Sequence, residues 1–210
     1  MYNKTRYLHA VRRRAGDREG RKMHFWGHLK TVTKHRYLVM VHCFRVGLYR
    51  QGLTHDLSKF SPTEFMAGIR YYQGDRSPNV AEREANGCSL AWMHHKGRNR
   101  HHFEYWTDLR PGTREYVPVP MPTRYLVEMC MDRIAACKTY HGRNYTASDP
   151  IDYLNRAQES PLMHPDTMRK TRYLLQMLAD RGERETFRFI KRHVLRGEPF
   201  AEAPDGGGAY

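Results

Sequence analysis

Apolar residues recur at helical spacing through most of this chain, and that periodicity limits the folds open to it. Val32, Val39 and Val46, for example, follow one another at intervals of seven, which places them on one face of a helix. No segment shows the alternation of apolar and polar residues that is typical of a half-buried strand. No Rossmann or P-loop glycine motif is present either. The sequence therefore predicts an all-α protein.

Capping residues predict where some of these helices begin and end. Ser61 suits the N-cap of a helix, Pro62 its first position and Glu64 the capping-box position, so a helix should run to about residue 72. Gly52 is a suitable stop for the helix before it. That earlier helix is expected over residues 25–51, and further helices over residues 80–95 (weakened at Gly87), 123–140, 150–158, 165–181 and 183–196.

The length of 210 residues favours one domain with a tail at each end. No stretch approaches the roughly 18 apolar residues of a membrane span, which predicts no membrane insertion. The four cysteines form no CxxC pair, so buried thiols in a reducing cytoplasm are expected. The predicted parts are a basic N-terminal arm over residues 1–22, a helical domain over 23–197 and a flexible tail over 198–210.

Positive charge is concentrated at the N-terminus. The formal net charge is +14, and residues 1–50 carry 13 Lys and Arg but only two acidic residues. The electrostatic field of such a segment attracts anions, whether nucleic acid, a membrane surface or a phosphorylated metabolite. The same basic residues can also form a solvated face that has no partner. Tyr2, Arg6 and Tyr7 interleave aromatic rings with cations, as a strand-binding arm does. Nucleic acid is therefore one partner open to the N-terminus.

Histidine and aspartate stand where apolar residues are expected. Asp132 lies three positions after Met129 and four before Ala136, on a face that should point into the core. An ionised carboxylate there needs a cation, which Arg133 or a metal ion could supply. His35 likewise lies between Val32 and Val39. Because His28, His35 and His42 are about 10 Å apart per step at 1.5 Å rise per residue, at most one of them can bind a compact metal centre.

Further possible ligands lie between His35 and Asp132 in the chain. His55-Asp56 lies just past the first long helix or in the first turn of the next one. Two histidine doublets, His94-His95 and His101-His102, come before Asp132. Imidazole nitrogens and carboxylate oxygens are ligands for borderline and hard divalent metals. The competing interpretation of the doublets is a solvated loop of His and Arg.

This order resembles that of the HD-domain superfamily, helical metal-dependent phosphohydrolases named after their adjacent His and Asp. The segment Leu53-Thr54-His55-Asp56-Leu57-Ser58-Lys59 is similar to the family signature, and the resemblance spans about residues 28–141. The string from Trp92 to Trp106 also resembles an uncharacterised HD-related family. The resemblance implies an HD-like helical bundle. It also implies one metal ion held by His35, His55, Asp56 and Asp132, with Asp56 bridging to a second ion completed by one of His94 and His95 and one of His101 and His102.

The activity that this resemblance implies is hydrolysis of a phosphate ester, a nucleotide being one candidate, with one or two divalent ions among Mn, Fe, Zn, Co and Mg. Asp56, Lys59 and His95 are the expected catalytic residues, and Lys59, Lys96, Arg98 and Arg100 are suited to hold phosphate oxygens. Two alternatives stay open. One is an HD-type di-iron oxygenase, because the ligand types also suit iron. The other is a basic nucleic-acid-binding helical protein.

Overall fold

The computed structural model describes residues 24–156 and 160–201, and the chain is all-α. The predicted basic arm over residues 1–22 lies outside the described residues, as does most of the predicted tail. The described part of the chain forms two compact units. Unit 1 comprises residues 24–33 and 57–95, and unit 2 comprises residues 34–56, 96–156 and 160–201. The first helix, α2 (Phe25–Val46), belongs to unit 1 up to Thr33 and to unit 2 from Lys34.

Unit 1 is built from short helices that begin at capping residues. The Ser61 hydroxyl accepts a hydrogen bond from the backbone N–H of Glu64 at 3.4 Å, and Pro62 occupies the first turn, as predicted. The hydroxyls of Thr31 and Tyr72 lie 2.8 Å apart and join the start of α2 to the end of the helix that Ser61 caps. The elements are η2 (Leu57–Phe60), α4 (Pro62–Tyr71), α5 (Pro78–Asn86) and α6 (Leu90–Lys96), whose last residue enters unit 2.

Unit 2 is organised around α7 (Thr123–His141). Leu126, Met131 and Ile134 of this helix are almost completely buried, and α8 (Asp149–Arg156) and α9 (Pro165–Arg192) pack against it. Each such side chain contributes about 1.5–3 kcal/mol by leaving water. The shorter elements are α3 (Tyr49–Thr54), η3 (Phe103–Tyr105), β1 (Thr107–Leu109), β2 (Tyr116–Pro118), η4 (Gly142–Asn144) and η5 (Val194–Arg196).

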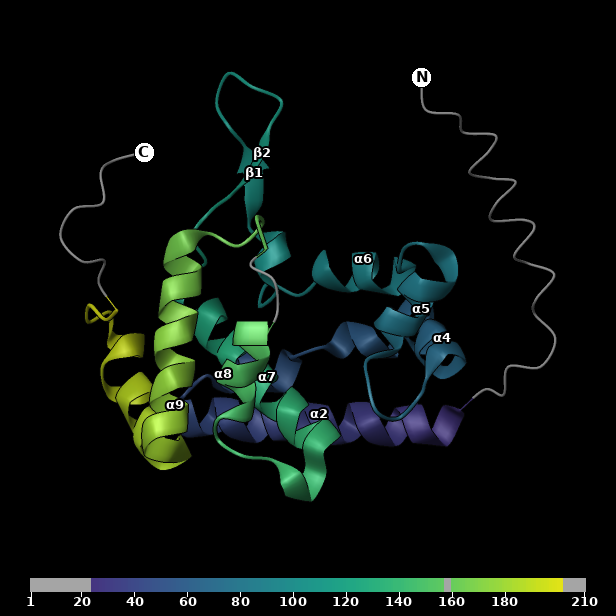
Figure 1. Cartoon of the computed structure of the whole chain (residues 1–210), viewed down its shortest axis with the longest axis horizontal. Coiled ribbons are helices and arrows are strands. Elements are labelled where there is room, and N and C mark those ends of the chain that lie inside the picture. The colour runs from purple at the N-terminus through teal and green to yellow at the C-terminus, as the bar shows by residue number, and fades with distance from the viewer. Residues whose placement is uncertain (1–23, 157–159, 202–210) are drawn as a thin grey trace. The chain divides into compact units, whose positions relative to one another are not determined.

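The strands β1 and β2 form a small two-stranded sheet for which the sequence showed no pattern, in a chain that remains all-α. They pair antiparallel with Leu109 opposite Tyr116, and Figure 1 shows them as a hairpin extending away from the helices of unit 2. Each strand has three residues. An alternating pattern needs about four or more residues to be recognised, so the sequence carried no usable signal for this hairpin.

Glycines divide the helices, though not always where the sequence predicts. The helix α2 ends at Val46, where Gly47 follows with a φ of +93° that suits glycine, and it does not continue to Gly52. Gly52 is buried inside α3, where an added Cβ would lie 3.0 Å from the Cβ of Cys43, so its role is close packing. Gly87 separates α5 from α6 with a φ of +79°. Gly182 interrupts α9 with a φ of +73°, at the predicted gap between two helices.

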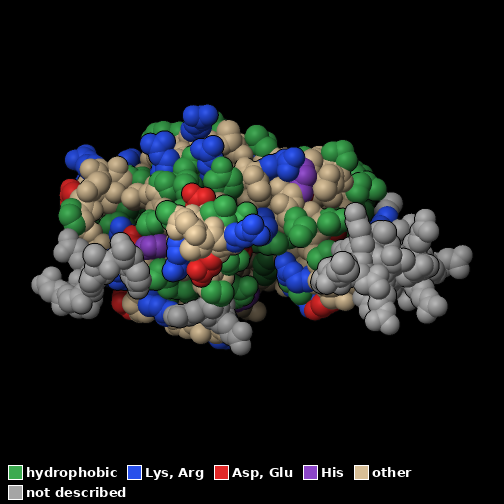
Figure 2. Space-filling view, turned by 90° about the horizontal axis from the view of Figure 1, so that it is seen from above, with side chains coloured by type: hydrophobic (Ala, Val, Ile, Leu, Met, Phe, Trp, Pro, Cys, Tyr) green, Lys and Arg blue, Asp and Glu red, His purple; other side chains and the backbone are tan. Residues whose placement is uncertain are grey.

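Positive charge is prominent on the face of the protein that Figure 2 shows. Figure 2 shows many Lys and Arg side chains on the visible face and fewer Asp and Glu, in line with the net charge of +14. Across the described residues, no helix combines the length and the apolar character that crossing a membrane requires.

Substitution of Gly68 by Ala is expected to destabilise unit 1 by about 1–3 kcal/mol, the usual cost of overpacking. An added Cβ would lie 2.1 Å from Nε2 of His28, which is buried against this helix. Urea denaturation of the Gly68→Ala variant measures the loss. In a His28→Ala background the same change should be neutral or stabilising, because Ala is the better helix former. An equal loss in both backgrounds would show that the contact with His28 is not the cause.

Candidate metal centre

The His55-Asp56 pair lies at a helix junction in unit 2. The helix α3 ends at Thr54, His55 follows with a φ of −51° and a ψ of 127°, and Asp56 has a φ of +53°. Asp tolerates this left-handed region better than most residues, but the conformation still needs support from its surroundings. Arg36 gives that support. Its Nε donates to the backbone carbonyl of His55 at 2.8 Å, and its Nη2 donates to that of Leu53 at 3.3 Å.

Three predicted ligands from different elements meet beside this junction. His35 comes from α2, His55 from the junction and Asp132 from α7, and their possible ligand atoms all lie within 4.8 Å of one another. Nε2 of His35 is 2.9 Å from Oδ1 of Asp132, and Nε2 of His55 is 3.6 Å from the same oxygen. The polar residues that interrupt two apolar helix faces therefore face each other.

Asp56 joins this group to one of the histidine doublets. Its Oδ2 is 3.5 Å from Nε2 of His55, and its Oδ1 is 3.4 Å from Nε2 of His101. Asp56, His101 and His102 also offer ligand atoms within 4.8 Å of one another. Nε2 of His101 lies 3.9 Å from Oδ2 of Asp132. The structure thus places Asp56 between two neighbouring sets of donors in unit 2.

Glu128 is a member of this cluster that the sequence analysis missed. Its Oε1 is 3.0 Å from Nδ1 of His55 and 3.3 Å from Nδ1 of His101. Because an ionised carboxylate only accepts hydrogen bonds, Nδ1 of His55 carries a proton that it donates to Glu128, and Nε2 can bind a metal ion once it has lost its own proton. Glu128 lies four residues before Asp132 on the same face of α7, and this spacing was the available signal.

The buried carboxylates of the cluster need a positive charge nearby. Burial disfavours charge on His55, but Asp56, Asp132 and Glu128 more than offset burial and raise its pKa to about 10. Burial alone would raise the pKa of Asp132 and that of Glu128, yet the neighbouring imidazoles hold both below their ordinary values. Three carboxylates in a largely buried site need a compensating positive charge, which either a proton or a metal ion can supply.

The donor set fits a divalent metal ion. Although His55 is buried, its Nε2 makes no hydrogen bond within the described part of the chain. Its Nδ1 is held by a carboxylate, the arrangement that orients metal-binding histidines. Imidazole nitrogens and carboxylate oxygens suit Zn, Mn, Fe and Co, with Mg favouring the oxygens. Among the described residues of the stripe His28, His35 and His42, only His35 belongs to a group of this kind.

The other two histidines of the stripe have different surroundings. In unit 1, burial first and then the charge of Lys59 lower the pKa of His28 to about 4. In unit 2, Nε2 of His42 is 3.2 Å from the ammonium of Lys138, and its Nδ1 is 3.5 Å from the carbonyl oxygen of Met131. With Lys138 donating to Nε2, Nδ1 carries the proton, so His42 is neutral.

The first histidine doublet belongs to unit 1 and binds a carboxylate there. Nδ1 of His94 is 2.6 Å from Oε1 of Glu64, and Nδ1 of His95 is 2.7 Å from Oε2. The Ser58 hydroxyl also lies 3.3 Å from Nδ1 of His95. Glu64 therefore does not complete the predicted capping box: its side chain contacts the two histidines, and the backbone N–H of Ser61 donates to the carbonyl of Ser58 at 2.8 Å. Lys59 lies in unit 1 as well, so the proposed roles of Lys59, His94 and His95 at the metal stay predictions.

The remaining predicted substrate-binding residues, Lys96, Arg98 and Arg100, lie in unit 2 just before His101. Arg100 is exposed, and its Nη1 donates to the Tyr125 hydroxyl at 3.4 Å. Its guanidinium also lies 5.7 Å from the centre of the Tyr105 ring. This cation is therefore held beside the loop that carries His101 and His102.

Fold and site together define an all-α protein with a candidate divalent-metal centre. The chain belongs to a family described as "Family of unknown function (DUF5662)", which matches residues 24–177. The matched span includes every residue of the candidate centre. Searches of the curated proteins and of the solved structures found no match to this chain.

Proposed function

We propose that this protein is a metal-dependent phosphohydrolase that cleaves a phosphate ester of a small molecule. The observation that carries the proposal is the convergence of His35, His55 and Asp132 within 4.8 Å, beside Asp56. These four residues match, in chain order, the ligands that the HD-domain resemblance implies for one ion. The separate set of Asp56, His101 and His102 supports a second ion in the same unit.

The residues of unit 2 would have three roles in such a site: metal binding, orientation of the ligands and phosphate binding. His35, His55, Asp56 and Asp132 would hold one ion, and Asp56 with His101 and His102 would hold another. When bound, divalent ions lower the pKa of water toward 7 and polarise phosphoryl oxygens. Glu128 orients His55 and His101. Lys96, Arg98 and Arg100 are suited to bind the phosphate oxygens of the substrate, the arginines through two parallel hydrogen bonds each.

A reducing cytoplasm is the compartment that we propose with this activity. Cys43 and Cys130 are free, buried thiols. Burial raises the pKa of Cys130 to about 12, which suppresses the reactive thiolate at neutral pH. Thiols of this kind are typical of proteins that do not depend on disulfides.

Metal analysis combined with a substrate screen tests the proposal. The full-length chain, purified without chelator, should carry at least one divalent ion per molecule. It should release phosphate or the alcohol from some members of a panel of phosphomonoesters, phosphodiesters and nucleotides. A chelator should abolish the release, and added metal should restore it. Absence of stoichiometric metal would refute the proposal. Oxygen consumption by an iron-loaded protein, without phosphate release, would instead support the di-iron oxygenase alternative.

A further inference from the structure

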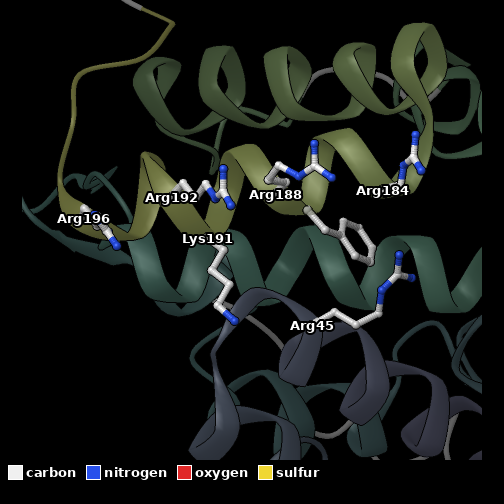
Figure 3. Close-up of a pocket in the computed structure, with 7 residues that line it drawn as sticks. Arg45, Arg184, Arg188, Lys191, Arg192 and Arg196 are labelled. Atoms are coloured by element: carbon white, nitrogen blue, oxygen red, sulfur yellow. The ribbon is translucent and has the colours of Figure 1, made fainter.

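A second candidate site lies in unit 2 between the C-terminal half of α9 and the end of α2. It is a cavity of about 490 Å³ whose lining includes no carboxylate. The seven lining residues are Arg45, Arg184, Phe187, Arg188, Lys191, Arg192 and Arg196, shown in Figure 3. Six of the seven are cations. This basic groove shares no residue with the candidate metal centre.

Four of the five arginines of the groove form a row. Arg184, Arg188 and Arg192 are spaced by four, so they lie on one ridge of the helix about 6 Å apart at 1.5 Å rise per residue. Arg196 follows in η5 and continues the row, as Figure 3 shows. Lys191, also on α9, extends in the same view toward the end of α2, the helix that carries Arg45. The groove therefore presents positive charge along a line and not at a single point.

Arg45 is fixed at one wall of the groove. Its guanidinium lies 4.4 Å from the centre of the Phe187 ring, and its Nη1 donates to Oε2 of Glu183 at 2.7 Å. Glu183 also pairs with Lys138, so this carboxylate is shared by two cations. Within the described residues, Arg184, Arg188 and Arg192 form no ion pair of their own. Their mutual repulsion opposes folding, and a bound anion would relieve it.

The ligand that this arrangement fits is a chain of phosphates. Arginine binds phosphate through two parallel N–H···O bonds, and five of the six cations are arginines. The one aromatic residue, Phe187, is 3% exposed and has Arg45 over its ring, so no free ring face is available for a base to stack on. No lining residue offers an exposed apolar side chain that could enter a lipid bilayer.

We infer that the basic groove binds the phosphodiester backbone of a nucleic-acid strand without reading its sequence. Contacts to backbone phosphates position a nucleic acid but carry no base information. Binding is therefore electrostatic and weakens as salt rises, because each neutralised phosphate releases counterions. Metal binding at the other site is not required for it.

Fluorescence anisotropy with the full-length chain and a labelled 20-nucleotide oligo-dT strand tests this inference. The variant Arg188→Gln/Arg192→Gln should bind at least about tenfold more weakly at 50 mM salt than the unmodified chain. The slope of log affinity against log salt should become shallower by about 1.4, at roughly 0.7 per phosphate contact on a single strand. Titration in the presence of a chelator should give the same affinities.

The matched control is Arg143→Gln/Arg156→Gln, which removes the same charge from exposed positions of η4 and α8. It should bind within about twofold of the unmodified chain, and thermal melting should show both variants folded. Equal losses in the two variants would overturn the inference, since net charge alone would then account for binding. It would also be overturned if the chain bound phosphatidylserine vesicles or inorganic polyphosphate through the groove but not the oligonucleotide, or if it bound none of these probes.

Discussion

Replacing Asp132 with Asn is expected to remove metal from the candidate centre and to lower phosphate-ester hydrolysis by about a thousandfold or more. Oδ1 of Asp132 lies 2.9 Å from Nε2 of His35 and 3.6 Å from Nε2 of His55, so this carboxylate is central to the set of donors. The amide that replaces it is neutral and a weaker ligand. Losing several kcal/mol of transition-state stabilisation corresponds to such a factor. Elemental analysis and initial rates on the substrate found by screening measure both effects.

Asp152→Asn is the matched control, because Asp152 is an exposed residue of α8 in the same unit. This variant should keep the metal content and the rate of the unmodified chain. A melting curve for Asp132→Asn separates loss of metal from loss of the fold. Full metal content in a folded Asp132→Asn protein would contradict the assignment of Asp132 as a ligand, whatever happened to the rate.

The long helices could be predicted because their apolar residues repeat over many turns. The first helix boundary could not, because two glycines follow the same apolar run. Gly47 ends α2 with a φ of +93°, whereas Gly52 allows close packing against Cys43 inside the next helix. Both roles require glycine. Which glycine has which role depends on how the chain folds in three dimensions, and the local sequence pattern does not give that information.

His35 and Asp132 could be identified because each interrupts an apolar face. Glu128 could not be identified in this way, because its part of α7 is buried on all sides. The run from Leu126 to Met131 has no exposed residue. A helix buried all round shows no polar face against which a misplaced carboxylate stands out. For the same reason a charged residue in such a run deserves consideration as part of a site.

The expected roles of the histidine doublets depended on information that the sequence lacks. His94 and His95 both bind Glu64 in unit 1, and Glu64 had been predicted only as a capping residue. His101, by contrast, lies next to Asp56 and Glu128. Nothing in a His-His dipeptide states which carboxylate each ring will meet, because that depends on contacts between distant segments.

Glu128→Gln is expected to weaken metal binding by about 10- to 100-fold without changing the number of ions bound at saturation. Such losses are typical when a group that orients metal ligands is removed. The Oε1 atom of Glu128 holds Nδ1 of His55 at 3.0 Å and lies 3.3 Å from Nδ1 of His101. Glutamine keeps the shape but loses the negative charge that stabilises both imidazoles. Competition with a chelator of known affinity measures the change.

Excess metal should therefore restore hydrolysis in Glu128→Gln but not in Asp132→Asn, and this difference separates a positioning residue from a ligand. Glu185→Gln, at an exposed position of α9, is the control for the loss of one carboxylate. If Glu128→Gln bound one ion fewer at saturation, Glu128 would itself be a ligand, together with His55 and His101, whose donor atoms lie within 4.8 Å of it. The hydrogen-bonding distances from Glu128 to both Nδ1 atoms favour the positioning role.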